Sequence, residues 1–121
     1  MRLGLLAVAG AAGALARYGI GQAVGPRSFP WATFAINVTG ALALGFVLAG
    51  PIAARWPADI TTAIAVGFLG AFTTFSTFEF ETHALFEDGS WLLATINMFA
   101  SLFVGLIALR AGIVLARTWL T

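Results

Sequence analysis

Four long apolar stretches, separated by short polar interruptions, make up almost the whole chain. They predict transmembrane helices near residues 3–24, 31–54, 60–84 and 90–115, because about 20 apolar residues are needed to cross the hydrocarbon core of a bilayer. Turn residues, helix stops and short charged loops mark the boundaries between them. We therefore predict an all-α membrane protein with a single four-helix transmembrane domain over residues 1–121.

The composition agrees with this pattern and excludes other classes. Of the 121 residues, 60% are hydrophobic and 9% are charged, whereas a soluble domain of this size needs more charge because most of its residues lie near its surface. The net charge of +1 offers no basic patch for nucleic acid. The absence of cysteine excludes disulfides and thiolate metal sites. The expected partner is the lipid bilayer.

The arginines give only a weak preference for one orientation in the membrane. If the four spans alternate, the arginines divide into one set at one end, Arg2, Arg55, Arg110 and Arg117, and another at the opposite end, Arg17 and Arg27. Most of the acidic residues fall with the second set, so the bias is slight and permits insertion in both orientations. Because four helices leave no wide pore between them, we expect a homo-oligomer.

Small residues lie on three of the predicted spans, where they would let helix backbones approach closely in lipid. They are Gly10, Gly13 and Ala14 on the first, Gly40, Ala41 and Gly45 on the second, and Gly105 and Gly112 on the fourth. We also expect Asp59 to cap the third helix.

The third span has an unusual centre, in which Gly70 precedes four hydroxyl side chains within residues 73–77. Unwound backbone at membrane depth is tolerated only inside protein or beside water. A break over residues 70–74 would therefore point polar backbone inward, where two half-helix ends can hold ions. The alternative is a continuous helix whose hydroxyls bond to the preceding turn. The cluster favours the break.

Two pairs of polar side chains recur at helical spacing on other spans. Thr33 and Asn37 share a face of the second helix, and Asn97 and Ser101 share a face of the fourth. Such groups either hold helices together or replace the water around a passing anion. The spacing alone leaves both interpretations open.

Phe75 and Phe78 share a face of the third helix, just after its polar centre. Aromatic rings are electropositive at their edges, so a pair of edges can receive a small anion, although packing is the other explanation for such a pair. Arg17 is a candidate for attracting anions to a vestibule. No catalytic set of side chains and no phosphate-binding loop occurs in the sequence, so we do not predict an enzyme.

Three motifs together resemble a known family. GFLGAFTTFSTFEFE at residues 67–81, GAAGALARY at 10–18 and TFAINVTGALALG at 33–45 are similar to the small bacterial fluoride channels called Fluc, or CrcB-type channels. The resemblance implies an antiparallel, dual-topology homodimer in the bacterial inner (plasma) membrane. It also implies that fluoride leaves the cytoplasm passively through two pores in each dimer.

The resemblance further implies a third helix broken at its middle, where main-chain carbonyls of Gly70 and Thr73 from both copies hold a structural sodium ion. It assigns side chains along the fluoride pathway, namely Asn37, Phe75, Phe78, Ser101, Asn97, Thr33, Arg17 at the mouth and Glu81 as a vestibule carboxylate. Two positions depart from the family pattern. Gly105 stands where a further hydroxyl would extend the polar track, and Glu79 adds a second acid beside Glu81.

Two other classes compete with this interpretation. A proton-coupled multidrug exporter also has four short spans, but it needs a carboxylate embedded in the membrane to carry the proton. No Asp or Glu occurs before Asp59, and the later acids flank helix ends. A non-transporting accessory subunit would leave the hydroxyl and phenylalanine cluster of the third span without a purpose.

Overall fold

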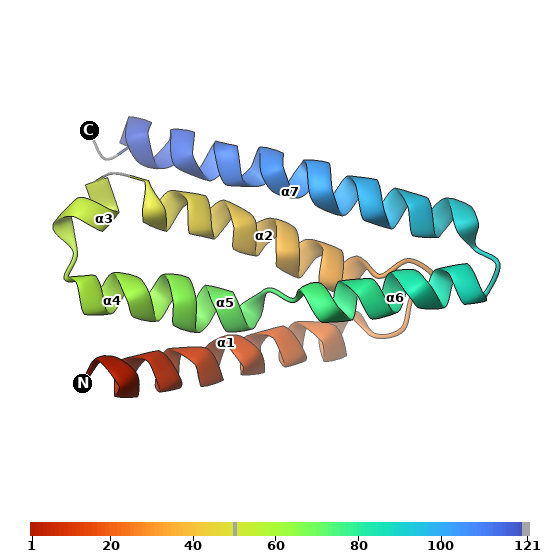
Figure 1. Cartoon of the computed structure of the whole chain (residues 1–121), viewed down its shortest axis with the longest axis horizontal. Helices are drawn as coiled ribbons and strands as arrows, with labels where there is room; N and C mark the ends of the chain where they lie inside the picture. The colour runs from red at the N-terminus through yellow and green to blue at the C-terminus, as the bar shows by residue number, and fades with distance from the viewer. Residues whose placement is uncertain (50, 120–121) are drawn as a thin grey trace.

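The computed structural model describes residues 1–49 and 51–119, and within these ranges it contains helices and no strand. Four helical segments are long and apolar enough to cross a membrane, namely α1 (Arg2–Val24), α2 (Trp31–Leu48), the composite segment Ala58–Glu87 and α7 (Trp91–Trp119). The prediction of an all-α protein with four candidate spans is confirmed. Figure 1 shows the four segments side by side in alternating directions, with the start of α1 and the end of α7 at the same end.

The helix bounds differ from the predicted ones mainly in the second span. α2 ends at Leu48, and a separate short helix, α3 (Pro51–Arg55), follows it. Ala49 adopts an extended backbone, and Pro51 has no backbone N–H with which to continue the helix. α7 extends through Arg110 and Arg117, because a long arginine side chain can reach water while its stem lies along apolar surface.

The third span is a series of shorter elements, α4 (Ala58–Thr62), the π-helix η1 (Ala63–Leu69), α5 (Gly70–Phe72) and α6 (Phe75–Glu87). Between α5 and α6, Thr73 and Thr74 have extended backbones, with ψ angles of 157° and 121°. Residues 70–72, which we expected to unwind, are helical. The sequence did not predict η1. π-helical turns are rare in proteins overall, but those that occur are often found at functional sites.

The prediction that Asp59 caps the third helix is wrong. The capping position is occupied by Pro57, and Asp59 lies in the first turn of α4. Its Oδ1 lies 2.6 Å from Nε of Arg2, at the start of α1. The carboxylate therefore pairs with Arg2 and not with a backbone N–H of the helix. Arg2 is far from Asp59 in the sequence, so this pair could not be predicted. The carboxylate remains favourable near the positive end of the helix dipole.

Glycines let two pairs of helices touch backbone to backbone. A Cβ on Gly45 or Gly112 would overlap a carbonyl of the facing helix in the α2–α7 pair, and a Cβ on Gly13 would overlap the carbonyl of Phe68 in η1. The prediction of close packing is confirmed at these positions. It is not confirmed at Gly105, where a Cβ would meet nothing within 4 Å.

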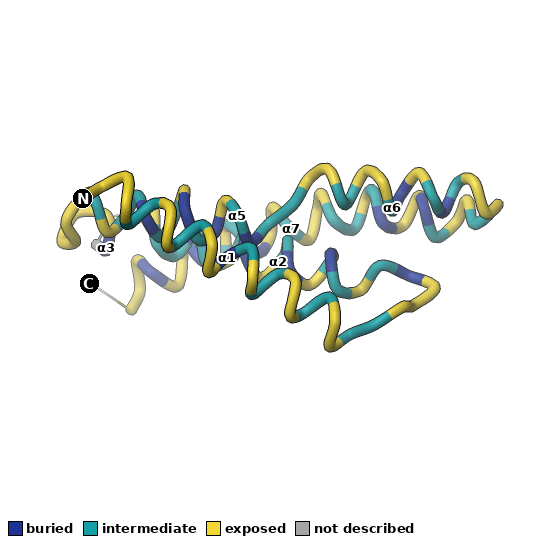
Figure 2. Tube along the Cα trace, turned by 90° about the horizontal axis from the view of Figure 1, so that it is seen from below, coloured by how far each residue is buried: buried dark blue, intermediate teal, exposed yellow. Residues whose placement is uncertain are grey.

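The third span changes its packing partner at the extended residues Thr73 and Thr74. Before them, η1 and α5 pack against α1, and after them α6 packs against α7. In Figure 2, α6 and α7 lie together on the right of the molecule, and the link from α1 to α2 lies apart from them. Much of the surface is exposed apolar side chain, as expected for helices that face lipid or another copy.

Candidate functional site

The junction between α5 and α6 is held by the hydroxyls of Thr73 and Thr74. Thr73 donates from Oγ1 to the carbonyl of Leu69 at 2.9 Å, which is the bond to the preceding turn that we considered as the alternative for this cluster. Thr74 instead caps α6, because its Oγ1 accepts from the backbone N–H of Thr77 at 3.3 Å. The hydroxyls of Thr73 and Thr74 therefore form hydrogen bonds at the end of α5 and at the start of α6, respectively.

Asn37 of α2 pairs with the backbone of Thr74 in both directions. The Thr74 N–H donates to Asn37 Oδ1 at 2.8 Å, and Asn37 Nδ2 donates to the Thr74 carbonyl at 3.1 Å. A primary amide has two N–H donors, so one N–H of Asn37 is left for another acceptor. Asn37 therefore holds α2 to the start of α6, and the same side chain keeps one N–H that could bind an anion, so both roles considered from the sequence apply to it.

Arg17 of α1 reaches the other side of the junction. Its Nε donates to the carbonyl of Ala71 at 3.1 Å, and the side chain is half-buried. Ala71 lies in the last turn before the extended residues, where carbonyls have no partner within the helix. Arg17 and Asn37, from two different helices, therefore bind the backbone on either side of Thr73.

An open groove of about 320 Å³ lies between α2 and the junction, lined by side chains that include Asn37 and Phe75 together with Gly70, Thr73 and Thr74. A Cβ on Gly40 would overlap the methyl group of Thr73, so glycine lets α2 approach the junction here. In the part of the chain that the structure describes, no N–H or O–H donates to the carbonyl of Gly70 or of Thr73. These carbonyls are therefore free to bind another group.

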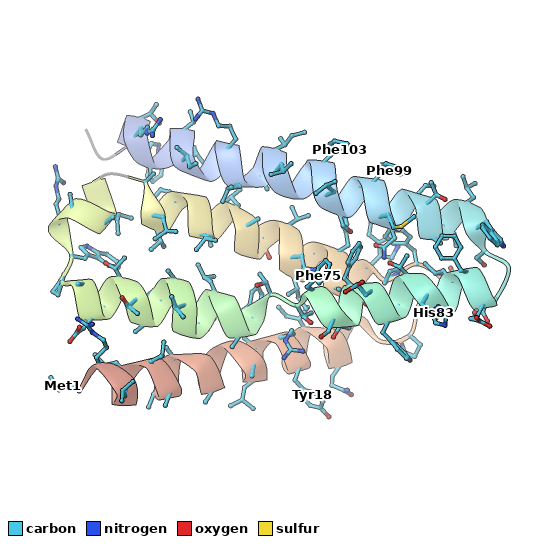
Figure 3. All side chains as sticks on the ribbon, viewed as in Figure 1. Met1, Tyr18, Phe75, His83, Phe99 and Phe103 are labelled. Carbon is cyan, nitrogen blue, oxygen red and sulfur yellow. The ribbon has the colours of Figure 1, made fainter. Side chains whose placement is uncertain are left out.

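Phe75 and Phe78 lie together at the start of α6, with ring centroids 5.9 Å apart and planes tilted by 40°. Phe75 is 70% exposed and lines the groove, whereas Phe78 is half-buried. Figure 3 shows Phe75 beside the α5–α6 junction, while Phe99 and Phe103 project from the far side of α7. The predicted aromatic pair therefore borders the polar junction.

A second cavity, of about 380 Å³, opens between α1, α2 and α6. Its lining brings together Arg17, Thr33 and Glu81, which the sequence analysis singled out, with Thr74 and Thr77. Thr33 is buried, and one carboxylate oxygen of Glu81 is buried without a hydrogen bond among the described residues. Thr74 lines both this cavity and the groove, so both spaces border the junction.

Asn97 and Ser101 lie apart from that junction, in the contact between α6 and α7. Asn97 is 1% exposed and donates from Nδ2 to Oγ1 of Thr82 at 2.9 Å, while Ser101 donates to Asn97 Oδ1 at 3.3 Å. Thr82 in turn donates to the Phe78 carbonyl at 2.8 Å. The sequence analysis missed Thr82; a buried amide requires a partner, but spacing along one helix does not identify a partner on the next.

Comparison with known proteins identifies the family. The model of the CrcB-like protein family (Camphor Resistance, CrcB) matches residues 4–113. A protein of Geobacter sulfurreducens named fluoride-specific ion channel FluC is 41% identical over 116 residues, covering 93% of this chain and 94% of that protein. A protein with the same name from Syntrophotalea carbinolica is 42% identical and covers 97% of this chain and 98% of its own length. Another from Nitratidesulfovibrio vulgaris is 46% identical and covers 90% of this chain and 91% of its own length. The chain therefore belongs to the CrcB family, as a multi-pass protein of the bacterial inner membrane.

Proposed function

We propose that this chain is a fluoride-selective channel through which fluoride leaves the cytoplasm passively. The observation that carries the proposal is the pair of cavities that border Thr74, one lined by Arg17 and Glu81 and the other by Asn37 and Phe75. This arrangement places cationic, amide, hydroxyl and aromatic groups on the two sides of Thr74. The relatives named as fluoride-specific channels support the same assignment across nearly the full chain.

The chemistry of these groups suits a small, strongly hydrated anion. A pore must replace the water around the ion with donors at short range. Arg17 and Thr33 serve at the mouth, Asn37 supplies its remaining amide N–H, and Phe75 and Phe78 present electropositive ring edges. Ser101 extends the path along α7, and Asn97 orients Ser101 through their hydrogen bond. Glu81, with a buried oxygen that lacks a hydrogen bond within the described chain, is the vestibule carboxylate.

We further propose that the junction holds a structural sodium ion. The carbonyls of Gly70 and Thr73 lack protein donors among the residues described, and they lie in the last turn of the helical run formed by α4, η1 and α5, where the helix dipole favours a cation. Carbonyl oxygens replace the water around alkali cations in other channels. Two carbonyls from one chain make half a site, and a second copy related by a two-fold axis would supply the same pair.

The second copy would be antiparallel to the first. The groove at Gly70 and Phe75 is open in the single chain, and both residues are exposed. A partner seated there would complete the sodium site and enclose two fluoride pores, each built from both copies. The small difference in arginine number between the two ends permits insertion in both orientations.

The alternative of a proton-coupled multidrug exporter is not supported by the distribution of acids. No Asp or Glu occurs before Asp59 or after Asp88, so α1, α2 and α7 provide no carboxylate to carry a proton through the membrane. Glu79 and Glu81 lie inside α6 and not at a helix end as the sequence suggested, and Glu81 lines the cavity that Arg17 also lines, where the proposed anion path has its mouth.

The decisive test is ion efflux from liposomes that contain the purified protein. We expect fluoride to leave rapidly while chloride stays inside, because the hydrogen-bond donors and ring edges beside the junction suit a small, strongly hydrated anion. Equal loss of both anions would overturn the selectivity, and no fluoride loss beyond that of protein-free liposomes would overturn the channel itself.

A further inference from the structure

Arg17 lies deep in the first span and uses an unusual atom for its contact. It precedes the end of α1 at Val24 by seven residues, which at 1.5 Å per residue places it about 10 Å from that end. Charged residues at such depth are rare and mark function. The contact with Ala71 comes from Nε, the nitrogen nearest the backbone, which leaves the terminal nitrogens facing the cavity that Arg17 lines.

The neighbours of Ala71 make this contact important. Ala71 directly follows Gly70 and precedes Thr73 by two residues, so its peptide lies between the two carbonyls of the proposed sodium site. Each residue has only two freely rotating backbone angles, and fixing the Ala71 carbonyl therefore restricts the direction of both neighbouring carbonyls. Asn37 fixes Thr74 from the other side.

We propose that Arg17 is a positioning residue for the cation site, acting through its hydrogen bond to the Ala71 carbonyl in addition to any attraction that its charge exerts on anions. The inference rests on the proposed function, because it assumes the sodium site at Gly70 and Thr73. Charge alone acts in the opposite direction, since a guanidinium repels sodium. The two contributions can therefore be separated by the sign of their effect.

Two neutral variants isolate the hydrogen bond. Arg17→Gln keeps an N–H donor the same number of bonds from the backbone as Nε, and Arg17→Met keeps a similar length without a donor. We measure the thermal unfolding of each purified protein against sodium concentration, with N-methylglucamine as the replacement cation, since a bound ion stabilises the folded state. We call the sodium midpoint the concentration that gives half of the stabilisation seen at the highest sodium concentration used. We expect this midpoint to be severalfold, up to about tenfold, higher for Arg17→Met than for Arg17→Gln, as a neutral hydrogen bond commonly contributes a factor of this size.

Arg27→Met is the matched control. Arg27 also donates from Nε to a backbone carbonyl, that of Val24 at 3.2 Å, but it does so on an exposed part of the chain. Its sodium midpoint should equal that of the wild type. Should Arg17→Met not purify as folded protein, Arg17→Lys replaces it: Lys keeps the charge but carries its amine one atom further out. A raised midpoint relative to wild type supports the inference, and an unchanged one overturns it.

The inference is overturned if Arg17→Met and Arg17→Gln share one sodium midpoint, because charge would then account for the whole effect. It is also overturned if the wild type is not stabilised by sodium. In that case fluoride efflux from liposomes containing the same wild-type protein decides the channel function separately, since efflux and thermal stabilisation are independent measurements.

Discussion

The side-chain amide of Asn37 lies opposite the backbone of Thr74 and exchanges two hydrogen bonds with it, at 2.8 Å and 3.1 Å. This pairing satisfies both the N–H and the C=O of Thr74, whose extended backbone interrupts the helical hydrogen-bond pattern between α5 and α6. The second N–H of the Asn37 amide makes no bond to Thr74, and Asn37 lines the adjoining groove, so this N–H can serve a group bound in that groove. A change at Asn37 therefore affects both the junction and the proposed pathway.

We predict that Asn37→Asp lowers fluoride efflux by about tenfold or more, because a carboxylate oxygen would face the Thr74 carbonyl where a donor is required. Efflux is measured with a fluoride electrode on liposomes, and dimers are checked by size-exclusion chromatography. Undiminished efflux from intact dimers would remove Asn37 from the pathway.

Phe75→Ile should reduce fluoride efflux by about tenfold, because an aliphatic side chain has no electropositive edge to present to an anion. Phe99→Ile is the matched control: Phe99 is also exposed, but it lies on α7 and stacks on Phe103. Efflux rates per folded dimer provide the comparison. If the two variants conduct equally, the aromatic ring at position 75 has no special part in permeation.

Asn97→Ala should lower the free energy of unfolding by about 1–2 kcal/mol, since the amide is buried and Thr82 would lose its donor. Unfolding is followed by circular dichroism in detergent. Ser101→Ala, which removes only one long hydrogen bond at the edge of the same cluster, should cost less. A variant at Asn97 as stable as the wild type would show that this cluster does not hold α6 to α7.

A pair of glycines on α7 tests the helix packing. Gly112→Ala should prevent close contact with α2, because the added Cβ would overlap the Leu42 carbonyl. Gly105→Ala meets open space and should be neutral or stabilising by up to about 1 kcal/mol, the difference in helix propensity. Melting temperatures in one detergent give the comparison. Equal melting temperatures would mean that α2 and α7 do not rely on glycine for their approach.

Much of this architecture follows from local features of the chain. The number of spans could be predicted because the apolar length per crossing is set by the bilayer. Gly13, Gly45 and Gly112 could be chosen as contact points because small residues favour close packing in lipid. The polar centre of the third span could be recognised because four hydroxyls within residues 73–77 have little purpose on a lipid-facing surface.

The errors arise from contacts between segments that are far apart in sequence. The cap at Asp59 was predicted wrongly because its partner, Arg2, is 57 residues away in sequence. Residues 70–72 were expected to unwind because glycine weakens a helix, yet packing against α1 keeps them helical. Neither Thr82 nor the Ala71 carbonyl could be identified as a partner, because the register between neighbouring helices is not encoded in the spacing of either one.

The amino-acid sequence alone predicts a chain that crosses a membrane with four helices and carries neutral polar groups and aromatic rings, rather than acids, near the middle of its spans. That information lies in composition and in helical periodicity, both of which are local. The change of packing partner at Thr73 and Thr74, and the contacts that Arg17 and Asn37 make with the backbone there, emerge only in the folded chain. Those contacts depend on how separate helices slide and rotate against one another, which no single segment specifies.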